Sequence, residues 1–196
     1  SADPTGLNWC LHLEGYQVPT QLASIEQARA RGFTTSMQST GLPPQWLRQY
    51  RNRMFESFDI VMLHQESLDY VGLGKDDPTS SIRRLAELAK AARAPWPRIV
   101  VVTLGKHGAA AVTQDGAVVC APALPVTVVD TTGAGDSFVG CFLAVWLNCA
   151  DAALAIRLAC IAGSLQVTRF GAQEIRPSAS TLARLAPQAA AAATHA

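Results

Sequence analysis

Two short, continuous apolar runs most constrain how this chain can fold. They are Phe58–Leu63 (FDIVML) and Arg98–Leu104 (RIVVVTL). Continuous apolar runs of this length are typical of parallel strands that are covered on both faces. The segments around them have helical spacing. Strands that alternate with helices predict βαβ units, and therefore an α/β fold with a mostly parallel sheet.

The remaining elements are predicted from spacing and from turn residues. We expect further strands at Asn8–Glu14 and Phe33–Gln38, and a hairpin formed by Gly108–Thr113 and Ala117–Ala121. We expect helices at Gln21–Arg31, from Pro43 through Met54, from Pro78 to near Pro95, and at Ala134–Leu147, Asp151–Thr168 and Ser180–Leu185. No linker divides the chain, so one domain is expected over residues 1–187. The low-complexity tail, residues 188–196, is expected to be a frayed helix end or disordered.

Composition excludes several classes of function. The 196 residues carry 16 basic and 15 acidic side chains, a net charge of +1, which argues against nucleic-acid or membrane-surface partners. No apolar run reaches the roughly 18 residues of a membrane span. The start has neither the basic nor the apolar region of a signal peptide. The five cysteines lack metal-like spacing, so we expect reduced, buried thiols and a cytoplasmic location or another reducing compartment.

The stretch Asp130–Val139 (DTTGAGDSFV) carries the strongest chemical signal. Glycines let backbone N–H groups approach an anion without interference from a Cβ atom. The helix that follows points its positive end toward the same place. Asp136 in the first turn would lie beside a phosphate site, where it could take a proton from an attacking hydroxyl. The alternative is purely structural: Asp136 caps a helix and the glycines turn the chain.

Two common nucleotide motifs are absent. Neither Gly74-Lys75 nor Gly105-Lys106 is followed by Ser or Thr, so the sequence has no Walker P-loop. The first predicted strand is not followed by the GxGxxG motif of dinucleotide-binding proteins. A nucleotide would therefore have to bind by another route.

Three segments resemble a known family whose members bind a nucleotide without either motif. DTTGAGDSF, followed by Val139-Gly140 and an apolar helix, closely resembles the C-terminal signature of the ribokinase-like (PfkB) carbohydrate kinases. Residues 102–109 (VTLGKHGA) are similar to that family's turn near the ATP phosphates, and residues 167–173 (VTRFGAQ) match a ribokinase segment. The resemblance implies a three-layer α/β/α fold and ATP-dependent phosphorylation of a sugar hydroxyl.

The resemblance also implies roles for individual residues. Asp136 would be the general base, and the amides of Gly133, Ala134 and Gly135 would form the anion hole for the transferring phosphoryl group. The residues expected to contact ATP are Thr103, Gly105, Gly108, Gly133 and Gly135.

Two ion sites are implied in the same way. The family's NxxE motif, which orders Mg²⁺ and its waters, falls on Leu63–Glu66, with Leu63 in place of the asparagine. Glu66 would act on Mg²⁺ through water. Asp130, Thr132 and the backbone around Gly171 would surround a monovalent cation such as K⁺, which prefers oxygen ligands. Ile175 stands where some ribokinases have a serine.

The resemblance covers about Asn8–Leu185, which corresponds to the C-terminal two-thirds of the family's chains. The family's N-terminal glycine motif and its small β lid, which clasps the sugar, have no counterpart here. Ribose is the first expectation for the sugar, because DTTGAGDSFVG and VTRFGAQ are most like ribokinases, and fructose and other sugars stay open. A homodimer or a larger assembly is left open.

Other classes of function also have to be considered. The chain could be a catalytically silent, kinase-derived subunit that serves as a scaffold in a larger assembly, which Leu63 and the absent lid would favour. It could also be an unrelated α/β binding protein. An intact Asp136 beside GAGD opposes the scaffold hypothesis, since a scaffold has no physical need for a base beside an anion hole.

Overall fold

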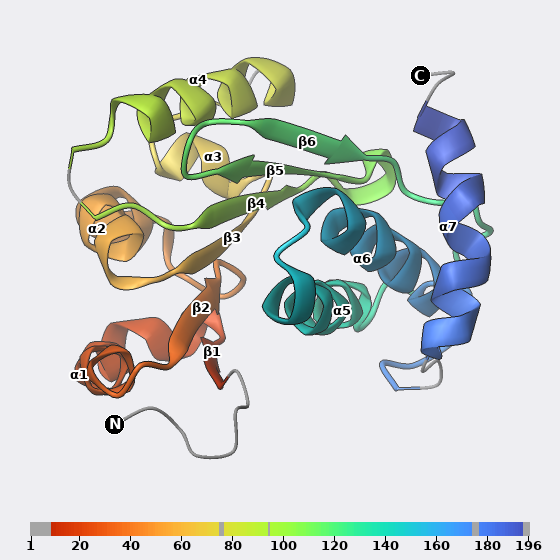
Figure 1. Ribbon diagram of the computed structural model, residues 1–196, viewed down its shortest axis with the longest axis horizontal. Helices are drawn as coiled ribbons and strands as arrows, with labels where there is room; N and C mark the ends of the chain where they lie inside the picture. The colour runs from red at the N-terminus through yellow and green to blue at the C-terminus, as the bar shows by residue number, and fades with distance from the viewer. Residues whose placement is uncertain (1–8, 75–76, 94, 174–176, 194–196) are drawn as a thin grey trace. The chain divides into compact units, whose positions relative to one another are not determined.

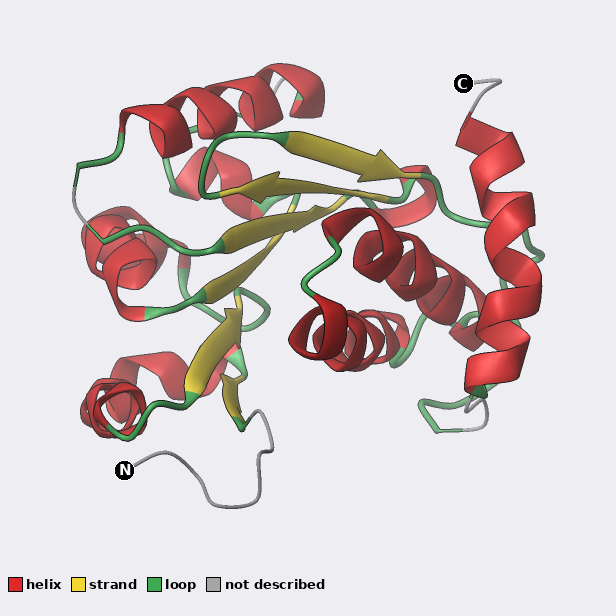
Figure 2. Ribbon diagram, viewed as in Figure 1, coloured by secondary structure: helices red, strands yellow, loops and turns green. Residues whose placement is uncertain are grey.

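Strands alternate with helices along the first half of the chain, as Figure 2 shows. The computed structural model describes residues 9–74, 77–93, 95–173 and 177–193. The first four strands are β1 (Cys10–Leu13), β2 (Thr34–Gln38), β3 (Ile60–His64) and β4 (Ile99–Thr103). The helices among them are the 3₁₀ turn η1 (Gly15–Gln17), α1 (Val18–Ala30), α2 (Pro44–Ser57), α3 (Ser67–Tyr70) and α4 (Pro78–Ala91).

The six strands form one sheet in the order β1-β2-β3-β4-β5-β6 (Figure 1). Strands β1 to β4 are parallel, with Leu13 opposite Met37 and Ile60 opposite Ile99. Strands β5 (Ala109–Thr113) and β6 (Val118–Ala121) follow as a hairpin. In its turn, Thr113 N donates to Ala117 O at 3.0 Å. The predicted α/β class with a mostly parallel sheet is therefore confirmed.

The centre of the sheet is apolar on both faces. Successive residues of β3 and β4 are at most 2% exposed: Ile60, Val61, Met62, Leu63, Ile99, Val100, Val101 and Val102. This is the burial that the two continuous apolar runs predict. At roughly 25 cal/mol per Å² of buried apolar area, these side chains are a main source of stability.

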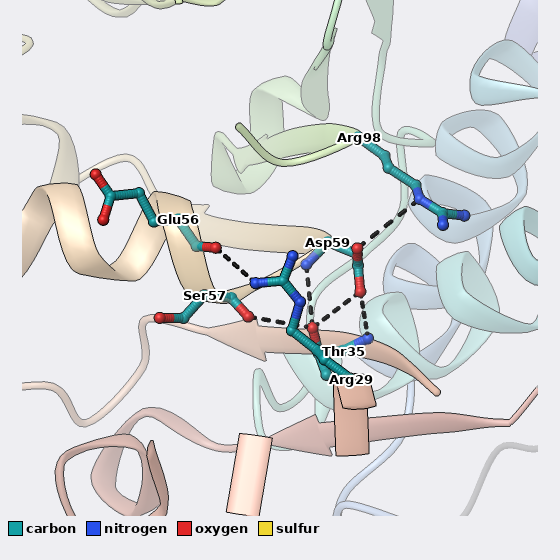
Figure 3. A network of polar contacts seen from close by, with 6 residues as sticks. All are labelled: Arg29, Thr35, Glu56, Ser57, Asp59 and Arg98. Carbon is teal, nitrogen blue, oxygen red and sulfur yellow. Dashed lines mark hydrogen bonds and ion pairs between the residues drawn. The ribbon is translucent and has the colours of Figure 1, made fainter. Parts of the chain in front are cut away.

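A buried polar network fixes where β2 and β3 begin (Figure 3). Thr35 is fully buried, and its hydroxyl donates to Asp59 Oδ2 at 3.0 Å and to Ser57 O at 3.3 Å. The N–H of Thr35 also donates to Asp59 Oδ2, at 2.9 Å. Arg29 Nη1 donates to Glu56 O at 2.7 Å, which ties α1 to the end of α2. The bonds of Thr35 satisfy polar groups that would otherwise be costly to bury, whereas the bond of Arg29 is exposed.

The chain divides into two compact units, Ser1–Thr103 with Ala111–Val118, and Leu104–Ala110 with Val119–Ala196. The helices of the second unit are η2 (Gly105–His107), α5 (Ala134–Cys149), α6 (Ala152–Gln166) and α7 (Ala179–Ala193). Helix α5 packs along α6, and α6 packs against α7. Phe142 of α5 is fully buried between the rings of Phe138 and Trp146.

The sequence predicted most elements to within a few residues, but two helices differ. The short helix α3 was not predicted, because four residues carry no usable periodicity. Helix α7 continues past Pro187 to Ala193, beyond the end predicted at Leu185 and into the expected tail. Alanine is the best helix former, which explains the extension. Asn8, in the first predicted strand, lies outside the described residues.

The cysteines are less uniformly buried than expected. All five are free; Cys160 is buried, Cys10 and Cys141 are half-buried, and Cys120 and Cys149 are exposed. Burial raises the pKa of Cys160 to about 12 and that of Cys141 to about 11, so these two thiols stay protonated and unreactive. Among the described residues, no helix is both long and apolar enough to cross a bilayer.

Candidate active site

The glycine-rich loop turns into α5 at a residue that only glycine suits. Gly133 precedes the helix with φ +77°, in the left-handed region. A Cβ atom there would also lie 2.8 Å from Ala172 O and 3.1 Å from Ala172 Cβ. The loop therefore packs closely against the segment after α6, with no room for a side chain at this position.

Asp130 joins these two segments through both carboxylate oxygens. Oδ1 accepts from Thr132 N at 2.9 Å and from Thr132 Oγ1 at 2.7 Å, and Oδ2 accepts from Gly171 N at 2.9 Å. The Thr132 N–H, then the Gly171 N–H and the Thr132 hydroxyl, lower the pKa of Asp130 below its ordinary value. Three of the predicted site residues, Asp130, Thr132 and Gly171, are thus brought together.

Gln166, at the end of α6, is a residue of this site that the sequence reasoning missed. Its side chain is 1% exposed, and Nε2 donates to Gly171 O at 2.7 Å and to Thr132 O at 3.3 Å. Its Oε1 accepts from Ser137 Oγ at 3.4 Å. The available signal was a polar residue at the end of a mostly apolar helix that also carries Arg157 and Ser164. That signal does not reveal which loops the side chain would join.

The N-terminus of α5 presents backbone donors next to the candidate base. Asp136 lies exposed in the first turn. Ala134 N donates to Thr131 O at 3.2 Å. Within the described parts of the chain, the amides of Gly133, Gly135 and Asp136 have no acceptor. The helix therefore offers amide donors and the positive end of its dipole beside a carboxylate, an arrangement suited to an anion and a proton transfer.

The backbone at Gly135 is not covered by neighbouring described residues. A Cβ atom built at Gly135 would meet nothing within 4 Å. Steric pressure from the fold does not explain this glycine, in contrast to Gly133. Among the described residues nothing covers the backbone at Gly135, so it is accessible to a ligand.

The second glycine turn lies in the same unit. Leu104 N donates to Gly108 O at 2.8 Å, and Gly108 N donates to Gly105 O at 3.1 Å. Both glycines have positive φ, +57° at Gly105 and +94° at Gly108. A Cβ atom at Gly108 would lie 2.7 Å from Ala123 N, so Gly108 is required by packing, whereas Gly105 meets nothing within 4 Å. Gly105 is thus the member of this predicted ATP-contacting pair whose backbone is open to a ligand.

The first unit holds the remaining predicted residues at the carboxyl ends of its strands. Thr103 ends β4, and its carbonyl accepts from Gln65 N at 3.0 Å. Glu66 follows β3 and is exposed, with Oε2 lying 4.0 Å from His64 Nδ1. Leu63 is 1% exposed inside β3, so its side chain cannot reach an ion bound outside this strand end.

A hollow of about 360 Å³ adjoins Glu66 in this unit. Its polar lining comes from Gln65, Glu66, Asp69, Tyr70 and Ser81. Ligands of open α/β sheets bind outside the carboxyl ends of the strands, where this hollow lies. The described residues contain no group of three His, Cys, Asp or Glu side chains that could hold a metal ion by themselves. A Mg²⁺ ion bound through one carboxylate, waters and substrate phosphates does not need such a group. Ile175, the predicted departure at the cation site, lies outside the described residues.

Several known proteins are similar to this chain in sequence and in fold. The pattern of the pfkB family carbohydrate kinases matches residues 12–179. A fructokinase from Klebsiella pneumoniae is 37% identical over 147 residues, which are 72% of this chain and 45% of that protein. A ribokinase from Bacillus subtilis is 34% identical over 124 residues, which are 63% of this chain and 42% of that protein. The chain thus spans less than half the length of these two relatives.

The crystal structure of a fructokinase from Vibrio cholerae O395, with fructose, ADP and a calcium ion bound, is similar at a TM-score of 0.71 and 26% identity. The likeness covers 91% of this chain and 61% of that one. It confirms the predicted three-layer, ribokinase-like α/β fold. The family match covers most of the chain, in agreement with the glycine-rich signature and the strand order. The chain therefore belongs to the pfkB family of carbohydrate kinases.

Proposed function

We propose that this chain supplies the nucleotide-binding and catalytic part of an ATP-dependent sugar kinase. The observation that carries the proposal is the position of Asp136, exposed in the first turn of α5 beside backbone amides that have no acceptor among the described residues. Family membership supports the same reaction class. The acceptor is proposed only as a sugar hydroxyl, with ribose and fructose both candidates.

The proposed chemistry assigns one step to each group. Asp136 accepts the proton of the sugar hydroxyl as its oxygen attacks the γ-phosphorus of ATP. A new P–O bond forms while the bond from the γ-phosphorus to the bridging oxygen breaks, and ADP leaves. The amides of Gly133, Ala134 and Gly135 hold the transferring phosphoryl group. Because Ala134 N already donates to Thr131 O, its contribution requires the anion to replace that acceptor.

Thr103, Gly105 and Gly108 complete the proposed ATP site, together with Gly133 and Gly135. Glu66 is proposed to hold Mg²⁺ through water, which its exposed carboxylate beside a hollow makes feasible. When bound, Mg²⁺ neutralises phosphate charge. The cytoplasmic location and a homodimeric or larger assembly stay predictions. A monovalent cation at Asp130, Thr132 and Gly171 is not part of the proposal, because Gln166 already donates to the carbonyls of Thr132 and Gly171.

Replacement of the candidate base tests the proposal. In the complete protein that contains this chain, Asp136→Asn should lower phosphoryl transfer from ATP at least about 100-fold, because base catalysis is lost. The thermal unfolding midpoint should stay the same, since Asp136 is exposed. Equal transfer rates for the variant and the parent would disprove the assignment.

A catalytically silent scaffold is the alternative function. It predicts that ATP with Mg²⁺ produces no rise in the unfolding midpoint. The kinase proposal predicts a rise, since a ligand at 100 times its Kd adds about 2.7 kcal/mol to stability. Thermal unfolding with and without ATP and Mg²⁺ separates the two functions even if the sugar is unknown.

A further inference from the structure

Gln166 is the most buried polar group near the candidate active site. It is the last residue of α6 and 1% exposed. The orientation of its amide follows from its neighbours. The carbonyl oxygens of Thr132 and Gly171 can only accept hydrogen bonds, so Nε2 faces them. The hydroxyl of Ser137 can donate, so Oε1 faces it.

These contacts satisfy two carbonyls that converge on one place. Thr132 belongs to the loop before α5, and Gly171 belongs to the segment after α6. Two carbonyl dipoles that point at the same position repel each other unless a positive group lies between them. The two N–H bonds of one primary amide provide that positive group, at 3.3 and 2.7 Å.

A monovalent cation would need the same oxygens. The family resemblance implies such an ion at Asp130, Thr132 and the backbone around Gly171, yet the carbonyls of Thr132 and Gly171 already accept from Gln166. Both carboxylate oxygens of Asp130 are also engaged, by Thr132 N and Oγ1 and by Gly171 N. An ion held by both carbonyls at once would compete with an amide nitrogen whose hydrogens carry positive charge. The residues present therefore do not fit the ion.

We propose that the side-chain amide of Gln166 takes the place of the monovalent cation and closes these two loops without an ion. Gln166 is thus a positioning residue that holds Thr132 and Ser137, and through them the start of α5. The statement about catalysis rests on the proposed function, whereas the statement about the loops does not. The proposal predicts that neither the stability nor the activity of the protein depends on K⁺.

Thermal unfolding in two salts tests this proposal without ATP or sugar. The parent protein should unfold at the same temperature in KCl and in choline chloride of equal concentration. Gln166→Ala should unfold about 4–10 °C lower in choline chloride, because two buried carbonyls lose their donor. KCl should restore most of that loss, since the emptied position now offers the two carbonyls of Thr132 and Gly171 to a cation.

Two further variants keep the test decisive. Gln166→Met keeps the volume but removes the donors, so it should show the same loss and a weaker response to KCl. Ser164→Ala, in the same helix, is the control: Ser164 is 7% exposed and accepts from Leu124 N at 3.0 Å. Loss of the Ser164 hydroxyl leaves the Leu124 N–H without an acceptor, and no cation can take the place of an acceptor. The unfolding midpoint of Ser164→Ala should therefore fall equally in both salts.

Either of two results would overturn the proposal. One is a rise in the unfolding midpoint of the parent protein that is specific to KCl. The other is an equal midpoint for Gln166→Ala in the two salts. Asp136→Asn should leave all salt responses unchanged, so a failure of the kinase assignment is distinguishable from a failure of the Gln166 assignment. If kinase activity is found, it should be the same in KCl and in choline chloride for the parent protein.

Discussion

The carboxylate of Asp130 accepts the backbone N–H of Gly171 at 2.9 Å, which ties the loop before α5 to a segment 41 residues later in the chain. The same carboxylate holds Thr132, two residues away, through its N–H and its hydroxyl. Asp130 therefore fixes the approach to α5 from both sides.

Acid should weaken the hydrogen bonds that the Asp130 carboxylate accepts from Thr132 and Gly171. The hydrogen bonds lower its pKa below the ordinary value of 3.8, so the unfolded chain binds the proton more readily than the folded chain. This contribution to stability is complete above about pH 4 and is lost as pH falls through the lowered folded pKa. Unfolding midpoints measured between pH 7 and pH 3 should fall more steeply for the parent than for Asp130→Asn. Asp77 and Asp115, whose pKa values are also lowered, contribute equally to both proteins. Parallel curves would contradict the prediction.

Gly135→Ala should block ATP binding without harming the fold. The added methyl group meets nothing within 4 Å in the protein, and alanine favours a helix over glycine by roughly 1 kcal/mol. The methyl group would, however, occupy the space beside the unpaired amides. We expect an unfolding midpoint equal to or above that of the parent, and ATP affinity at least about 10-fold weaker, a loss of about 1.4 kcal/mol.

Gly140→Ala is the matched control for this experiment. Gly140 lies in the same helix, is exposed, and also has nothing within 4 Å of a built Cβ atom. It should gain the same helix stability and bind ATP as the parent does. Titration calorimetry with ATP and Mg²⁺ measures both variants. Equal affinity at Gly135→Ala would remove the start of α5 from the nucleotide site.

Glu66→Gln should raise the Mg²⁺ concentration needed for half-maximal transfer. An amide keeps the shape of the side chain but loses the charge that attracts the hydrated ion. Loss of an outer-sphere partner typically costs about 10–100-fold in metal affinity. Glu87→Gln, at an exposed position of α4, is the control and should leave the requirement unchanged. An unchanged Mg²⁺ titration for Glu66→Gln would exclude Glu66 from ion binding.

Thr35→Val should destabilise the first unit. Valine has the shape of threonine but lacks the hydroxyl that donates to Asp59 Oδ2 and to Ser57 O. Because these partners are part of a buried network, we expect a loss of about 1–3 kcal/mol in the free energy of unfolding. Thr35→Ser keeps the hydroxyl and should lose only about 1 kcal/mol, for the missing methyl group. Urea unfolding with equal m values gives both differences. A larger loss for serine than for valine would assign the stability to packing instead.

Local sequence patterns predicted much of this protein because the forces behind them act over a few residues. The apolar runs at β3 and β4 predict strands that are covered on both faces, and residues from Ile60 to Leu63 and from Ile99 to Val102 are buried as expected. The glycine at position 133 predicts a turn into a helix, and its φ of +77° agrees. The end of the last helix differs from the prediction, since the helix-forming tendency of the alanines carries α7 past Leu185 to Ala193.

Only the tertiary structure decided which groups meet at the start of α5. Asp130 and Gly171 are 41 residues apart, and Thr132 and Gln166 are 34 apart, so no local period relates them. Their contacts arise because α5 and α6 pack side by side and bring the loop before one helix to the end of the other. The sequence by itself determined the strands, the glycine turns and the candidate base. Packing determined that a buried glutamine amide lies between the carbonyls where the sequence had predicted an ion.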